Sequence, residues 1–213
     1  MSYFLNTFRT PNPGKEAEVV EGVQKSMESL GVPGLVSVTI SPPNAHLEST
    51  KVTAVVPIPD AKGVDALMDA IFGNNMAALK ERSGLSELSR QENMSLSRVR
   101  ASNINSDDIG MEEFDPKYIM RRFFQPKMGK LQAFIDLMSD WMTDVNLKFA
   151  YSISTPVGGQ ITSVRITHLT ESFALMQELH DKIISDNRLS EQQSLIERPG
   201  VHSLGRITYS KRP

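Results

Sequence analysis

The sequence has no cysteine among its 213 residues, which excludes disulfide bonds, thiolate metal ligands and cysteine nucleophiles. It also has no excess of positive charge, since 23 lysines and arginines stand against 25 acidic residues and the formal net charge is −2. Nucleic-acid-binding domains carry a clear basic excess, so nucleic acid is not an expected partner. The lack of cysteine is compatible with a reducing cytoplasm, which is the location we expect.

Long apolar segments are missing as well. A membrane-spanning helix needs about 20 consecutive apolar residues, whereas the run at residues 54–58 is typical of the longest in this chain. No basic segment followed by an apolar core stands at the N-terminus, so neither a signal peptide nor a membrane partner is expected. The hydrophobic content of 39% and the charged content of 23% are those of a soluble globular protein.

Histidine is scarce, with four residues in the whole chain. They are His46, His168, His180 and His202, and they show neither the His-x₃-His spacing of a helical metal site nor a paired acid. We therefore expect no metal site. His168 and His202 fall on predicted strands and could face a cavity, although a hydrogen-bonded strand histidine is the plainer interpretation.

The feature that is present is an internal repeat. The segment from Tyr118 to Lys130 matches the segment from Tyr3 to Lys15 at an offset of 115 positions (118 − 3 = 115). The shared residues are a tyrosine, a phenylalanine, a proline, a glycine and a lysine, at positions 3, 8, 11, 14 and 15 and again at 118, 123, 126, 129 and 130. Later matches follow in the same order, such as Ala-Leu-Met at 66–68 and 174–176 (174 − 66 = 108). Matches in one order along both halves indicate duplication.

Each half predicts the same order of elements, β-α-β-β-α-β. Alternating or β-branched runs predict strands at 3–9, 35–40, 50–58, 93–101, 118–124, 148–155, 160–168 and 200–209. Apolar stripes at helical spacing lie between them, for example Val19, Val23 and Met27, and later Phe134, Met138 and Trp141. We expect helix ends at Asp60, Gly31 and Thr170, and a short extra helix capped by Ser190. The predicted domains are 1–101 and 117–213, joined by an acidic linker at 102–116.

This order predicts an α+β fold of two ferredoxin-like repeats, each with both helices on one face of a four-stranded sheet. The other face of each sheet is bare and partly apolar, so it needs a cover. The second repeat is tethered nearby, and packing the two sheets face to face would supply that cover. The expected architecture is therefore an intramolecular pseudo-dimeric barrel with a space between the sheets.

A family resemblance rests on the repeated motif. An aromatic strand, then Pro-Gly-Lys, then a helix such as Gly129-Lys-Leu-Gln-Ala-Phe-Ile135 resembles the start of domains in the dimeric α/β-barrel superfamily, which includes antibiotic-biosynthesis-monooxygenase-like and NIPSNAP-like proteins. The resemblance implies a barrel and a cavity for a hydrophobic or aromatic ligand. It does not imply one reaction, because members range from cofactor-independent oxygenases to haem-degrading enzymes.

Haem-degrading relatives rely on an asparagine, a tryptophan and a histidine. Asn6 lies on the first strand, where such an asparagine could stand. Trp141, the only tryptophan, lies on the apolar stripe of a helix in the second half, and no histidine occupies a comparable helix in the first half. A core position explains Trp141 better, and no cofactor is evident.

Two strand arginines complete the set of candidate ligand-binding residues. If Arg121 or Arg165 points into the barrel, it could anchor a carboxylate or an enolate. The alternative is cross-strand ion pairing or a charge that protects a sheet edge. The predicted cavity residues are thus Asn6, Arg121, Arg165 and His168, while no catalytic set is evident.

Two functions fit these expectations. The first is a monooxygenase-like enzyme acting on a small aromatic or hydrophobic substrate between the sheets. The second is a non-catalytic protein of the same fold that binds a small ligand or serves in assembly. A cavity lined by Asn6, Arg121 and Arg165 would favour the first, and a barrel filled by leucine, phenylalanine and methionine the second. Either could form a homo-oligomer.

Overall fold

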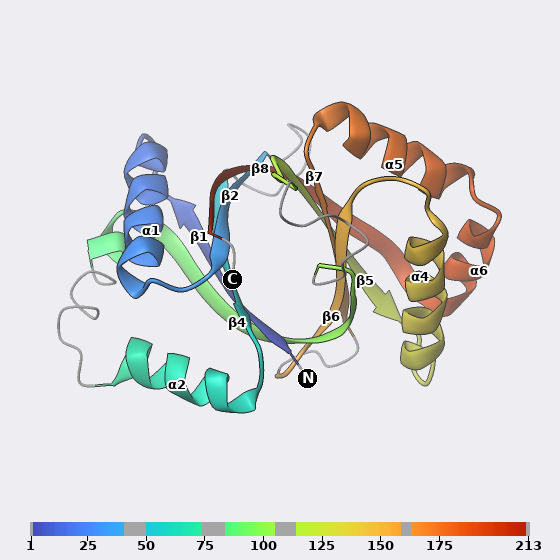
Figure 1. Cartoon of the computed structure of the whole chain (residues 1–213), viewed down its shortest axis with the longest axis horizontal. Helices are drawn as coiled ribbons and strands as arrows, with labels where there is room; N and C mark the ends of the chain where they lie inside the picture. Colours follow the sequence, from blue (N-terminus) through green and yellow to red (C-terminus); the bar gives the residue numbers. More distant parts are fainter. Residues whose placement is uncertain (1, 41–49, 74–83, 105–113, 159–162, 212–213) are drawn as a thin grey trace. The chain divides into compact units, whose positions relative to one another are not determined.

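The structure is a computed structural model that describes residues 2–40, 50–73, 84–104, 114–158 and 163–211. In chain order its elements are β1 (Tyr3–Pro11), α1 (Glu16–Leu30), β2 (Gly34–Ile40), β3 (Lys51–Ile58), α2 (Ala61–Phe72), β4 (Ser89–Ser102), β5 (Tyr118–Pro126), α4 (Leu131–Asp144), β6 (Ala150–Pro156), β7 (Val164–Thr170), α5 (Phe173–Ser185), α6 (Arg188–Leu195) and β8 (Ile196–Lys211). Figure 1 labels these elements along the chain. In hydrogen-bonded order the strands are β1-β3-β2-β8-β5-β7-β6-β4, a closed barrel. The expected α+β class and barrel are confirmed.

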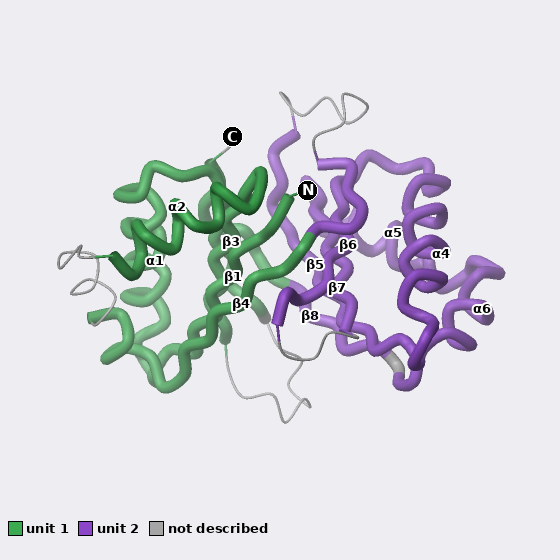
Figure 2. Tube along the Cα trace, turned by 90° about the horizontal axis from the view of Figure 1, so that it is seen from below, with its two compact units in different colours: residues 1–98, 205–213 green, residues 99–204 purple. Residues whose placement is uncertain are grey.

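The chain divides into two compact units (Figure 2). The first unit comprises residues 1–98 and 205–213, and the second comprises residues 99–204. This division differs from the predicted domains because the end of β8 returns to the first unit. There Gln24 Nε2 donates a hydrogen bond to Thr208 O at 3.1 Å, and Lys211 Nζ donates one to Gly31 O at 2.9 Å.

In the first unit β1 lies between β3 and β4, with both pairs antiparallel, and β2 pairs with the other edge of β3. Leu5 is opposite Val56 on β3 and Leu96 on β4, so these residues share one face of the sheet. Helices α1 and α2 cover that face. The core between the helices and the sheet includes Leu5, Val19, Val23, Met27, Val36, Val52, Ala54, Val56, Ile58 and Leu67.

The ends of α1 and α2 follow local chemistry. Gly31 adopts φ 64°, the left-handed conformation that glycine tolerates best, and its backbone N–H donates to Glu28 O. The Asp60 carboxylate accepts a hydrogen bond from the Gly63 backbone N–H at 2.8 Å and so caps α2. Both predicted helix ends are confirmed.

In the second unit β7 lies between β5 and β6, again antiparallel. Helices α4 and α5 pack on one face, and the core there includes Phe124, Phe134, Ile135, Met138, Trp141, Met142, Ile153, Ile166, Leu179 and Ile183. Trp141 is fully buried, and the Arg188 guanidinium lies 5.5 Å from the centre of its ring. The interpretation of Trp141 as a core residue is confirmed.

The Pro-Gly-Lys segments form the same turn in both halves. Gly14 has φ 79° and Gly129 has φ 75°, a conformation that side chains with a Cβ rarely adopt. The Lys15 N–H donates to Asn12 O at 3.0 Å, and the Lys130 N–H donates to Lys127 O at 2.9 Å. The repeated residues therefore make the same local structure before α1 and before α4.

Some boundaries differ from the prediction. Ser172, not Thr170, caps α5, because its hydroxyl accepts from the Leu175 N–H at 3.2 Å. Ser190 lies inside α6, where its hydroxyl donates to Asn187 O instead of capping the helix. Strands β4 and β8 both begin four residues before their predicted starts at 93 and 200 (93 − 89 = 4; 200 − 196 = 4). None of the helices among the described residues has the length and hydropathy to cross a membrane.

Candidate functional site

Two of the predicted site residues, Arg121 and Arg165, share the face of the second unit's sheet that points away from α4 and α5. Arg121 is opposite Thr167, and Arg165 is opposite Phe123 and Ser154. Both arginines are buried, with 2% and 8% of their surface exposed. Burial, and after it the nearby charge of Arg165, lower the pKa of Arg121 to about 9. Burial also lowers the pKa of Arg165 to about 10.

His168 lies on the opposite face of the same sheet, beneath the helices. Its Nε2 is 3.2 Å from Met142 Sδ, and its ring centre is 6.0 Å from that of Phe149. Burial holds the pKa of His168 well below its usual value, so the ring is neutral near pH 7. His168 is therefore not grouped with the two arginines.

Asn6 belongs to the first unit, on the face of its sheet away from α1 and α2. Its side-chain N–H groups donate to Phe4 O at 3.2 Å and to Ser95 O at 3.4 Å, and the residue is 1% exposed. These bonds tie the amide to the backbone of its own sheet. Within the second unit Arg121 and Arg165 therefore come together and His168 lies on the other face of the sheet, whereas Asn6 belongs to the first unit.

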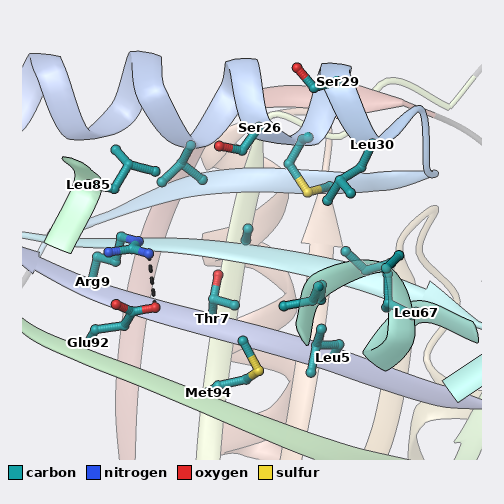
Figure 3. A pocket seen from close by; sticks show the side chains of 16 residues that line it. Leu5, Thr7, Arg9, Ser26, Ser29, Leu30, Leu67, Leu85, Glu92 and Met94 are labelled. Atoms are coloured by element: carbon teal, nitrogen blue, oxygen red, sulfur yellow. Dashed lines mark hydrogen bonds and ion pairs between the residues drawn. The ribbon is translucent and has the colours of Figure 1, made fainter. Parts of the chain in front are cut away.

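A pocket of about 360 Å³ lies in the first unit, between the helices and the sheet (Figure 3). The floor comes from β1, β3 and β4, and the walls come from α1, α2 and a short helical stretch at 84–87. Most of the lining is aliphatic or thioether: Leu5, Val23, Met27, Leu30, Ala54, Val56, Leu67, Ala70, Ile71, Leu85 and Met94. Such a lining favours an apolar ligand, and methionine adapts to ligands of varied shape.

An ion pair supplies the charged part of this pocket's lining. Arg9 Nη2 lies 2.9 Å from Glu92 Oε1, and Ser86 Oγ donates a hydrogen bond to the other carboxylate oxygen at 2.8 Å. The side chains of Arg9 and Glu92 are only 6% and 18% exposed. Thr7 lies between Arg9 and Leu5 on β1 and points into the pocket (Figure 3). Within the described residues no protein group accepts from or donates to its hydroxyl, so Thr7 can bond to a ligand.

This pocket is not among the sites predicted from the sequence, because the prediction placed the cavity on the faces of the sheets that point away from the helices. Leu5, Thr7 and Arg9 alternate along β1, which places one charge on the same face as the core residues. That pattern was the available signal. Its partner Glu92 fell outside the predicted strand, and the pairing of Arg9 with Glu92 depends on a register between strands that no local pattern encodes.

The described residues form no evident metal-binding site. Among the described residues no three histidine or acidic side chains converge as a metal site would require. His46 lies outside the described residues.

Comparison with known proteins points to the fold. No protein-family model matches the chain, and no curated protein matches it. A solved structure named "Putative monooxygenase" from Fusobacterium nucleatum is 10% identical with a TM-score of 0.75, over 99% of this chain and 94% of that one. An anthrone oxidase-like protein is 11% identical with a TM-score of 0.64, over 99% and 92%. A "Putative Chlorite dismutase" is 11% identical with a TM-score of 0.56, over 98% and 96%. At about 10% identity these likenesses concern the fold alone, and over nearly the whole chain they support the expected α+β barrel.

Proposed function

We propose that the first unit binds a small aromatic or hydrophobic substrate in its pocket and oxidises it in a monooxygenase-like reaction. The observation that carries this proposal is the apolar pocket with a nearly buried Arg9–Glu92 pair in its lining. Ligand pockets usually combine an apolar lining with a few convergent polar groups, and a volume of about 360 Å³ suits one small molecule.

The structural neighbours give the chemistry a direction. One is named for monooxygenase activity and another as anthrone oxidase-like. An anthrone is a flat aromatic ketone with a methylene group activated by its rings. Its oxidation replaces that methylene by a carbonyl, so one atom of O₂ enters the product and the other leaves as water with the two methylene hydrogens. The substrate supplies the electrons, so the proposed reaction requires no cofactor.

The Arg9–Glu92 pair suits the first step of such a reaction. Glu92 would accept a proton from the methylene carbon, leaving a substrate anion. Protonation removes the carboxylate charge beside Arg9, so the guanidinium can then stabilise that anion in a poorly solvated site. The Thr7 hydroxyl can donate to the substrate oxygen, which would orient the ring system.

Oxygen uptake with anthrone as the substrate tests this proposal. We expect O₂ consumption and anthrone loss in a one-to-one ratio in the full chain. Glu92→Gln should lower kcat by roughly a hundredfold or more, because the amide keeps the shape but cannot take the proton. Glu87→Gln is the matched control, since Glu87 is exposed and does not line the pocket. Uptake that is equal in the full chain and in Glu92→Gln would overturn the role of Glu92. Anthrone binding without any uptake would leave a binding protein and overturn the enzyme.

The finer architecture is also proposed. We infer that the chain is a tandem fusion of two ferredoxin-like repeats, NIPSNAP-like in this respect, which associate as a pseudo-dimer. The matched turns at Gly14 and Gly129 support this inference. Self-association of the whole protein and a cytoplasmic location stay predictions of the sequence.

A further inference from the structure

Three of the four histidines gather around one arginine in the second unit. Arg122, on β5, lies on the helix-covered face, and its Nη2 is 2.9 Å from Nδ1 of His180 on α5. The His180 ring meets the ring of His202, on β8, edge to face with their centres 6.2 Å apart. His168 of β7 is opposite Met120, the residue two positions before Arg122, so it shares this face.

Arg122 is buried without an anionic partner. It is 4% exposed, and among the described residues the only side chain bonded to it is His180. Its Nε is buried with no hydrogen-bond partner, and so is Nδ1 of His168. A buried guanidinium in proteins is normally paired with a carboxylate or another anion, because desolvating an isolated charge is unfavourable. The cluster therefore carries a positive charge and an N–H donor without a partner, and among the described residues no negative charge that would balance the guanidinium is bonded to it.

We propose that Arg122, His180 and His202 form a binding site for a small oxyanion of the phosphate type. The guanidinium presents planar N–H donors that match the oxygens of a tetrahedral anion, and it keeps its charge at any physiological pH. His202 is exposed and His180 is partly exposed, so the cluster can be reached from solvent. This site is separate from the pocket of the first unit and does not depend on the proposed oxidation.

The same groups make binding depend on pH. Burial and then the charge of Arg122 lower the pKa of His180, which Asp181 on the same helix partly offsets. Partial burial of its ring, and then the charges of Arg122 and His180, lower the pKa of His202 to about 4. Both rings are thus neutral near pH 7 while the site is empty of anion. A bound oxyanion favours the protonated rings, so binding takes up protons and becomes tighter as the pH falls. His168, another titratable group on this face, is fully buried and stays neutral.

Titration of the full chain with inorganic phosphate, followed by NMR of the histidine ring signals, tests the proposal. We expect the signals of His180 and His202 to move and their pKa values to rise. Affinity should be roughly tenfold higher at about pH 6 than at about pH 8, since uptake of one proton over two pH units allows up to about a hundredfold. Phosphate that leaves both rings unmoved, or binds equally at the two pH values, would overturn the site.

Variants locate the site. Arg122→Gln should weaken phosphate binding by about tenfold or more. His202→Gln should weaken it by about threefold and flatten its pH dependence, and this exposed position leaves the fold intact. Arg198→Gln is the matched control, because Arg198 is an exposed arginine on the same strand as His202. Loss of binding in Arg198→Gln, or full retention of affinity and pH dependence in His202→Gln, would show general attraction to surface charge and overturn the proposal.

Discussion

At the scale of single residues, the pair of Arg9 with Glu92 and the cluster around Arg122 are buried charged arrangements with different consequences. Arg9 is paired with Glu92, so its charge is balanced, and both side chains stay close to a pocket large enough for a ligand. Arg122 has a neutral histidine as its neighbour, so its charge is balanced only when an anion arrives. The first arrangement suits proton transfer from a bound substrate, and the second suits anion binding.

The lowered pKa of His168 predicts how the free energy of unfolding changes at acidic pH. Its folded-state pKa lies well below the ordinary value of 6.5, because burial disfavours the charged ring. Above about pH 6.5 the ring is neutral in both the folded and the unfolded chain, so it leaves stability unchanged. As the pH falls below about 6.5, the unfolded chain takes up a proton that the folded chain refuses, and the free energy of unfolding drops by up to about 1.4 kcal/mol per pH unit.

Urea unfolding at a series of pH values between about 8 and about 5 measures this dependence. His168→Leu should flatten the acid slope by close to one proton, whatever it does to stability at neutral pH. An unchanged slope in His168→Leu would mean that another group is responsible. His202→Gln should flatten the slope as well, because the pKa of His202 in the folded chain is also lowered, to about 4.

At the scale of the elements, helix ends differ in whether a side chain caps them. Ser172 accepts a hydrogen bond from the Leu175 N–H and caps α5, whereas Lys130 stands at the start of α4 with no capping bond from its side chain. Ser172→Ala should therefore lower the free energy of unfolding by about 1 kcal/mol, and Lys130→Ala should leave it nearly unchanged. Chemical denaturation of the two variants checks this. Equal losses would show that the bond of Ser172 adds no stability.

The elements also show what the sequence could predict. The stripe of α1, the cap at Asp60 and the glycine at 31 depend on residues a few positions apart, and they were found where expected. Glu92 could not be assigned to Arg9, because the two lie 83 positions apart and meet only through strand pairing. The sequence also does not decide which face of the sheet Arg121 occupies. Arg121 and its neighbour Arg122 are both buried in β5, so alternation along the strand does not separate them.

At the scale of the whole molecule, β8 carries residues of both units. Its last part pairs beside β2 in the first unit, where Thr208 Oγ1 donates to Val36 O at 3.4 Å and Ile207 is 9% exposed. A chain that ends at Leu204 loses this strand partner, so β2 would be left with an unpaired edge. Hydrogen exchange should then show faster exchange of the β2 amides by about tenfold or more, while the amides of β7 stay protected. Equal protection of β2 in the shortened and the full chain would contradict this assignment.

The pocket of the first unit is the claim on which the function depends. Calorimetry of anthrone binding in the absence of oxygen tests it, with Thr7→Phe as the variant that fills the pocket and Ser210→Phe as the control on an exposed strand position of the same unit. We predict that the full chain and Ser210→Phe bind anthrone alike, and that Thr7→Phe binds at least about tenfold more weakly. Unaltered binding in Thr7→Phe would place the ligand elsewhere and contradict the account.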